Sequence, residues 1–167
     1  NVVFLALGNS VAIVVGQLLG AGKMEEARDK DNKMIAFSVL ACSGVAIVML
    51  FMAPVFPMLY NTSEAVRHQA TLFMIAQAIF MPQGAFIHAA YFTLRSGGKT
   101  VITFLFDCGS IWILYLPFAF LLSRFTALPF LAIYAICNCT DLIKCIVGTV
   151  LIRSGSWIQY LAAPEKK

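Results

Sequence analysis

Charged side chains are scarce in this sequence. Asp, Glu, Lys and Arg together make up 12% of the 167 residues, and only two histidines are present. Globular domains carry about a quarter charged residues, so this chain has too few polar groups to cover a water-exposed surface. The scarcity argues against a soluble protein, and it leaves few side chains for acid–base catalysis or metal binding.

Motifs that bind nucleotides or metals are also missing. The stretch Arg95–Thr100 ends in Gly-Lys-Thr, but it lacks the additional upstream glycine of a P-loop and follows an apolar run instead of a strand. We therefore predict a tight helix-to-helix turn at Gly97 and Gly98. The five cysteines fall in apolar stretches without the spacing of a metal site or a disulfide framework. We expect no metal, no cofactor and no catalytic residue.

Apolar residues, in contrast, are abundant: they make up 60% of the chain, and the mean hydropathy is +0.86. Runs of about 18 or more such residues with almost no charge are typical of transmembrane helices. Five runs qualify: Asn1–Leu19, Met34–Leu59, Gln69–Leu94, Val101–Leu122 and Leu128–Ile152. Barrel strands would be shorter and would alternate. The sequence therefore predicts an all-α, polytopic transmembrane bundle in the lipid bilayer.

The basic residues between these runs are distributed unequally. Most follow the first, third and fifth runs: Lys23, Arg28, Lys30, Lys33, Arg95, Lys99, Arg153, Lys166 and Lys167. The other connections carry only Arg67 and Arg124. Short cytoplasmic loops accumulate Lys and Arg, so we expect the Asn61 and Arg124 loops to lie outside. The net charge of +4 then reflects topology, and we predict no nucleic-acid partner.

Polar residues share faces of the predicted helices. One side of the third span carries Gln77, Gly84, His88, Tyr91 and Arg95, interrupted at mid-depth by Pro82 and Gln83. Because polar groups are costly in lipid, such a stripe faces either a wet cavity or neighbouring helices, and the sequence leaves both open. The candidates for lining a substrate cavity are Gln77, Gln83, His88 and Tyr91.

Two spans contain a carboxylate. In the fourth, Thr103, Asp107 and Ser110 share a face, and Asp107 lies about 9 Å from the cytoplasmic end of the helix. It is either an ion-coupling residue or a structural hydrogen-bond acceptor. In the fifth span, Lys144 follows Asp141 by three residues, a spacing within reach on one helix face. We interpret this pair as a structural ion pair, with ion coupling as the alternative.

The segment Val15–Arg28 reads Val-Gly-Gln-Leu-Leu-Gly-Ala-Gly-Lys-Met-Glu-Glu-Ala-Arg. Gly16 and Gly20, four residues apart, predict close approach of another helix. Gly20 and Gly22 allow the helix to end, and the charged run Lys23–Lys33 is expected to form a short helix along the membrane surface. This segment resembles one that transporters of the MATE (multidrug and toxic compound extrusion) family carry after a span in each half.

The resemblance continues along most of the chain. The turn Leu94-Arg-Ser-Gly-Gly-Lys-Thr is similar to the family's cytoplasmic turn after the tenth helix, and Phe106-Asp-Cys with Trp112 and Pro117 is similar to the eleventh helix of a bacterial branch. It implies that residues 1–167 are helices eight to twelve, the C-terminal transmembrane lobe of a twelve-helix transporter without its N-terminal lobe. A start at Asn1 without a leader also indicates a piece of a longer protein.

The resemblance implies a multi-pass protein of the bacterial inner or plasma membrane: an antiporter that exports small amphipathic organic cations in exchange for H⁺ or Na⁺. One branch of the family holds an acidic cation ligand at about the position of Gln83 or Gly84, where this chain has no carboxylate. The coupling ion therefore stays open.

One alternative is a related flippase for a lipid-linked oligosaccharide, disfavoured by the few basic residues in the spans. A membrane-embedded enzyme is less favoured, because His88 and Asp107 are too few to specify one.

Overall fold

The structure, a computed structural model, describes residues 2–126, 129–155 and 157–158. Lys166 and Lys167, counted above among the cytoplasmic charges, lie outside these residues. Within them the chain is helical and contains no strand. Five segments are long and apolar enough to cross a membrane: α1 (Val2–Gly20), α2 (Met24–Met52), α3 (Glu64–Ser96), the segment Thr100–Phe125 and α6 (Phe130–Arg153). The prediction of an all-α transmembrane bundle is confirmed.

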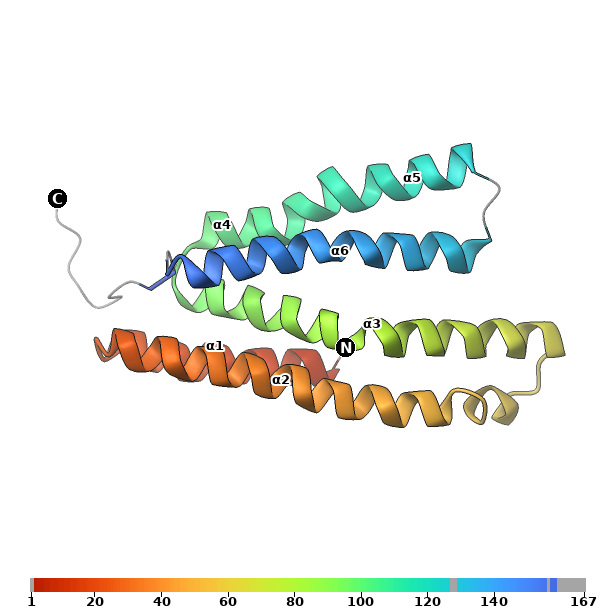
Figure 1. Cartoon of the computed structure of the whole chain (residues 1–167), viewed down its shortest axis with the longest axis horizontal. Coiled ribbons are helices and arrows are strands. Elements are labelled where there is room, and N and C mark those ends of the chain that lie inside the picture. The colour runs from red at the N-terminus through yellow and green to blue at the C-terminus, as the bar shows by residue number, and fades with distance from the viewer. Residues whose placement is uncertain (1, 127–128, 156, 159–167) are drawn as a thin grey trace.

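The helices run roughly side by side in alternating directions (Figure 1). The α1–α2 turn, the α3–α4 turn and the last residue of α6 lie at one end of the bundle, as the distribution of basic residues predicts. We call this the turn end. Gly22 and Gly98 adopt φ angles of 75° and 74° there, which favour glycine. Gly97 has no room for a side chain, because an added Cβ would lie 2.2 Å from the carbonyl oxygen of Trp157.

Helices α1, α2 and α3 form the most densely packed part of the molecule. The buried face of α2 repeats every three to four residues and consists of Ala27, Asp31, Ile35, Ser38, Cys42 and Ala46. On α1, Gly8 contacts α3, where an added Cβ would lie 2.2 Å from the Phe92 ring. The expectation of a close approach at Gly16 and Gly20 is not met by the described residues, because no atom of another helix lies within 4 Å of a Cβ added at either position.

The expected surface helix over Lys23–Lys33 is also not formed. Instead, α2 continues without interruption from Met24 to Met52. Glu25 and Glu26 occupy its first turn, where carboxylates complement the helix dipole, and Lys33 pairs with Asp29 one turn away at 2.6 Å. No residue in this stretch interrupts helical hydrogen bonding, so the charged turns extend the span along its own axis.

The fourth span contains two wide turns that periodicity did not predict. Between α4 (Thr100–Phe104) and α5 (Leu116–Phe125), the backbone forms two π-helical segments, η2 (Leu105–Gly109) and η3 (Ile111–Tyr115). Pro117 lies just after η3 and cannot donate a backbone hydrogen bond to the preceding turn. Its ring would collide with the carbonyl of Ile113 in a regular α-helix, and the wider turn relieves this collision.

Helix α3, in contrast, continues through its internal Pro82. The connection from α2 to α3 contains the short 3₁₀ helix η1 (Phe56–Leu59) and lies at the opposite end from the turn end (Figure 1). The last turn of α5 and the first turn of α6 lie at that same end. The arrangement therefore places the Asn61 and Arg124 connections together, away from the basic turns.

Candidate functional site

The polar faces of the third and fourth spans meet at a pocket of about 190 Å³. We call it the Asp107 pocket. Its lining residues are Tyr91 and Arg95 from α3, Thr100, Thr103 and Phe104 from α4, and Asp107 and Cys108 from η2. The Asp107 side chain is half-buried. The pocket therefore brings a carboxylate, a guanidinium and an aromatic hydroxyl together near the turn end.

The hydroxyl groups near Asp107 do not serve its carboxylate. Thr103 donates to the backbone oxygen of Lys99 at 2.8 Å. Ser110 lies 2.5 Å from the backbone oxygen of Phe106 and 2.9 Å from that of Asp107. Although Thr103 and Ser110 share a face with Asp107, these bonds go to the backbone and not to the Asp107 carboxylate. Their hydroxyls satisfy helical carbonyls instead, and the cation in the pocket, Arg95, comes from a different helix.

Two of the predicted cavity residues contact a neighbouring helix. The Tyr134 hydroxyl of α6 donates to the side-chain oxygen of Gln77, and the Gln83 amide donates to the backbone oxygen of Asn138 at 3.0 Å. Of the two readings that the sequence left open, these contacts support helix packing for Gln77 and Gln83. Interhelical hydrogen bonds of this kind hold membrane helices together in the absence of a hydrophobic driving force.

The third candidate, His88, faces α1. Its ring stacks on Phe4, with ring centroids 5.0 Å apart and an angle of 25° between the planes. Its Nδ1 lies 2.9 Å from the backbone oxygen of Gly84, and because a carbonyl can only accept, Nδ1 carries the proton in this contact. Of the four candidates, only Tyr91 lines the Asp107 pocket.

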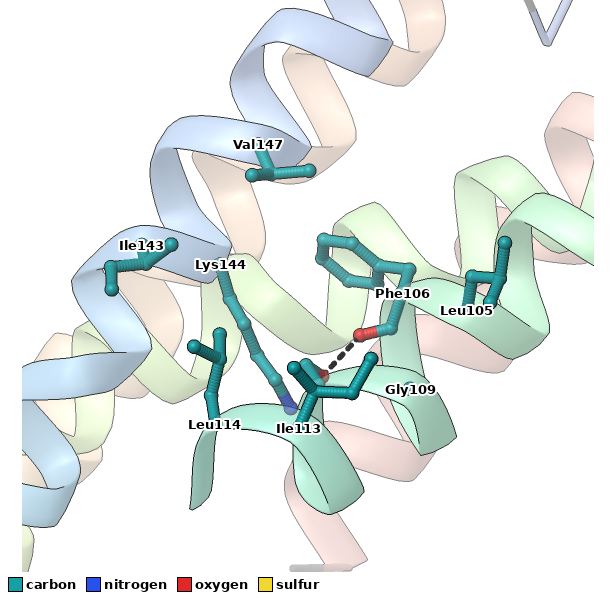
Figure 2. A pocket seen from close by; sticks show the side chains of 9 residues that line it. Leu105, Phe106, Gly109, Ile113, Leu114, Ile143, Lys144 and Val147 are labelled. Carbon is teal, nitrogen blue, oxygen red and sulfur yellow. Dashed lines mark hydrogen bonds between the residues drawn. The ribbon is translucent and has the colours of Figure 1, made fainter. Parts of the chain in front are cut away.

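The expected ion pair between Asp141 and Lys144 is not formed in this structure. The ion pairs within the described residues are the exposed pairs Lys23–Glu26 and Lys33–Asp29. Figure 2 shows Lys144 extending from α6 toward η2 and η3, into a largely apolar pocket of about 310 Å³. The Lys144 side chain lines this pocket beside the fourth span instead of pairing with Asp141.

One polar contact was missed by the sequence reasoning. Asp31, which lies within the charged run Lys23–Lys33, is fully buried, and Thr93 of α3 lies within hydrogen-bonding distance of its carboxylate. A usable signal was present, because Asp31 lies four residues from Ala27 and four from Ile35. That spacing places it on the apolar face of the helix.

Comparison with known proteins places this arrangement in a family. Residues 2–121 match the family model MatE. The chain belongs to the MatE family. The pocket residues Tyr91, Arg95, Thr103 and Asp107 all lie inside the matched range, so the Asp107 pocket is part of the MatE region of the chain.

A curated relative of this MatE chain is the "Probable multidrug resistance protein NorM" of Halalkalibacterium halodurans. The two sequences are 29% identical over 126 residues, which cover 74% of this chain and 27% of the relative. The chain thus spans about a quarter of that relative's length. No solved structure matches this chain significantly. With five segments able to cross the bilayer, this member of the MatE family is a multi-pass membrane protein.

Proposed function

We propose that this chain forms the C-terminal lobe of a secondary antiporter that exports amphipathic organic cations in exchange for H⁺ or Na⁺. Membership of the MatE family and a relative named as a multidrug resistance protein support the reaction class. The remainder of the transporter would supply the facing lobe, and the two lobes would alternate access to a site between them. The protein would reside in the cell membrane, where the ion gradient takes the place of a cofactor.

The observation that carries the proposal is the half-buried Asp107 carboxylate facing a pocket within a membrane span. Ionisable groups at such depth usually mark ion or substrate pathways. A carboxylate can hold a proton or a metal cation and release it when a cationic substrate arrives. Tyr91 and Phe104 line the same pocket with aromatic surface, which suits an organic cation.

The neighbouring polar residues take supporting roles in this proposal. Gln77 and Gln83 hold α3 against α6, and His88 holds it against α1. We propose that these contacts fix the position of the helix that carries Tyr91 and Arg95 into the pocket. Asp141 and Lys144 lie on α6, and neither lines the Asp107 pocket.

An export assay on the full-length transporter tests the proposal. Vesicles loaded with a fluorescent cation are assayed across a range of pH, with and without a sodium gradient. Asp107→Asn removes the titratable group and is expected to shift or abolish the dependence of export on pH or on sodium. Asp29→Asn is the matched control, because it makes the same change at an exposed position and should behave as wild type.

Two results would contradict the proposal. If the wild-type protein exports no organic cation in response to an ion gradient, the proposed antiport reaction is wrong. Identical pH and sodium responses in Asp107→Asn and wild type would instead leave the class standing and make Asp107 a structural residue.

A further inference from the structure

Asp31 lies where a charged side chain is costly. Its carboxyl group is fully buried on the inner face of α2, between Ala27 and Ile35 one turn to either side. Both neighbours belong to the buried core cluster of the lobe, together with Leu94 and Trp157. The carboxyl group is therefore removed from solvent and lies on an apolar surface, where an ionised form without a compensating partner is strongly disfavoured.

Around an ionised Asp31, the oxygens that need a hydrogen-bond donor outnumber the available donor protons. The Thr93 hydroxyl lies 2.6 Å from Asp31 Oδ1 and 3.0 Å from the backbone oxygen of Ala89. A hydroxyl has one proton to donate, so it cannot fully satisfy both oxygens. The other carboxyl oxygen, Oδ2, is buried without a hydrogen-bond partner within the described residues.

A proton on Asp31 resolves the shortage. The carboxylic acid would donate through Oδ1 to the Thr93 oxygen, and Thr93 would donate its own proton to the Ala89 carbonyl. Each donor then has one acceptor, and the carboxyl group carries no charge. A neutral acid also explains how Oδ2 is tolerated in the core, because an unpaired neutral oxygen costs far less than an unpaired charge.

The charged groups of the adjacent elements do not neutralise Asp31 in this structure. Helix α1 contains no titratable side chain. On α2, the guanidinium of Arg28 bonds to the backbone oxygen of Arg153, and Lys33 bonds to Asp29. Arg95 of α3 faces the Asp107 pocket. The basic residues nearest to Asp31 along these elements are all exposed: Arg28, Lys30, Lys33, Arg95 and Arg153.

We propose that Asp31 and Thr93 form a buried proton-binding site that joins α2 to α3 at the turn end of the lobe. With the proton bound, the carboxylic acid and the hydroxyl form a neutral hydrogen-bonded chain between the two helices. When the proton leaves for water, Thr93 must donate to the carboxylate, the Ala89 carbonyl loses that donor, and a charge remains in the core. Loss of the proton therefore weakens the α2–α3 contact.

This site is distinct from the Asp107 pocket. Asp31 is not among the lining residues of that pocket. Its hydrogen bond with Thr93 joins α2 to α3, whereas the pocket lies between α3 and the fourth span. The inference does not depend on what the transporter exports. A failed export assay would leave it intact, because its test is a measurement of protein stability.

The test measures thermal unfolding of the full-length protein in detergent from about pH 5 to about pH 9. A folded state that binds one more proton than the unfolded state becomes less stable as pH rises. Wild type should therefore lose stability relative to Asp31→Asn with increasing pH, because the amide keeps the neutral geometry at every pH. Asp29→Asn is the matched control on the same helix, with its carboxylate exposed, and its curve should run parallel to wild type.

A second measurement covers the case in which Asp31→Asn does not fold. Infrared spectra of the wild type at about pH 5 should contain the carbonyl band of a buried protonated carboxyl group. Thr93→Val retains the acid but removes its hydrogen-bond partner, so this band should shift. A Tm difference between wild type and Asp31→Asn that is independent of pH would overturn the proposal, as would an infrared band that is absent or unchanged in Thr93→Val.

Discussion

At the scale of single residues, the absence of a side chain determines how closely α1 approaches α3. Gly8 lies against the Phe92 ring so closely that one additional carbon would overlap it. At Gly16, two turns further along α1, an added Cβ would have no atom of another helix within 4 Å among the residues that the structure describes. The same residue type therefore has a packing role at one position and none at the other among the described residues.

This contrast predicts opposite outcomes for two alanine substitutions. Gly8→Ala should destabilise the folded protein by about 1 to 3 kcal/mol, because overpacking forces the buried Phe92 ring to move. Gly16→Ala should leave stability unchanged or raise it by up to about 1 kcal/mol, since alanine favours the helix. Thermal unfolding of both variants in detergent measures the difference. Equal stabilities would show that α1 does not contact α3 at Gly8.

The carboxylates also differ from one another at this scale. Asp31 is fully buried against apolar side chains, whereas Asp107 is half-buried at a pocket that Arg95 also lines. A group that exchanges ions during transport needs access to water, and the role proposed for Asp107 requires the Asp107 pocket to supply it. A group sealed in the core can exchange its proton only when the helices around it separate. The two environments therefore suit different roles for the same side chain.

At the scale of helices, polar side chains connect α3 to α6 inside the membrane. Gln77 accepts a hydrogen bond from Tyr134, and Gln83 donates one to the backbone of Asn138. The aromatic ring of Tyr134 also packs edge-on against Phe73, with ring centroids 5.5 Å apart. In lipid, apolar contact alone gives little preference for one neighbour over another, so such bonds help to fix which helices pair.

A double-mutant cycle measures this connection. Gln77→Leu and Tyr134→Phe each remove one partner of the hydrogen bond, and the two effects should be non-additive by about 0.5 to 2 kcal/mol. The control cycle combines Gln77→Leu with Tyr60→Phe, an exposed tyrosine outside the spans, and should be additive. Reversible unfolding in mixed micelles provides the free energies. Additivity in both cycles would show that the bond does not contribute to the α3–α6 contact.

The spans could be predicted from the sequence because lipid imposes a single requirement. Long apolar runs must become helices whose backbone groups are satisfied internally, and each of the five predicted runs overlaps an observed helical segment. The π-helical turn η3 before Pro117 could not be predicted, because it depends on how one ring meets one carbonyl. The burial of Asp31 was missed because a run of charges predicts a solvated surface more readily than a core position.

For the site, too, the sequence predicts the spacing of polar residues along a helix but not the direction in which each one points. The stripes of the third and fourth spans were visible as spacings, and the structure brings Tyr91 and Asp107 into one pocket. Which polar residues face a pocket and which face a helix depends on rotation about each helix axis. Gln77 and Gln83 contact α6 for that reason, and Lys144 lines a pocket beside η2 and η3 for the same reason. Such rotations are set by partners distant in sequence.

At the scale of the whole molecule, burial is unequal between the two sides of the bundle. In the apolar windows of α1 and α2, 28% and 22% of residues are buried, against 6% in the windows of the Thr100–Phe125 span and of α6. The last two spans therefore present apolar faces that lipid or other parts of the protein must cover. Helices α1, α2 and α3 pack tightly against one another, and the last two spans contact them mainly through α3.

The two ends of the bundle also differ in charge, and this difference predicts how the chain is oriented in the membrane. The first turn of α2, which contains Glu25, and the α3–α4 turn, which contains Lys99, lie at the turn end, whereas the α2–α3 connection, which contains Asn61, and the last turn of α5, which contains Arg124, lie at the other end (Figure 1). Because Lys and Arg are retained on the cytoplasmic side, the turn end should face the cytoplasm. A cysteine that reports this orientation should not replace Gly97, because a side chain there would collide with Trp157.

Single cysteines report this orientation when they are placed in the full-length protein with its native cysteines replaced. Asn61→Cys and Arg124→Cys should react with a membrane-impermeant maleimide added to intact cells, because both positions are exposed at the end predicted to lie outside. Glu25→Cys and Lys99→Cys should react only after the membrane is permeabilised. Labelling of Glu25→Cys from outside would contradict the orientation, and labelling of Asn61→Cys and Glu25→Cys from the same side would contradict the bundle itself, since an odd number of crossings must separate them.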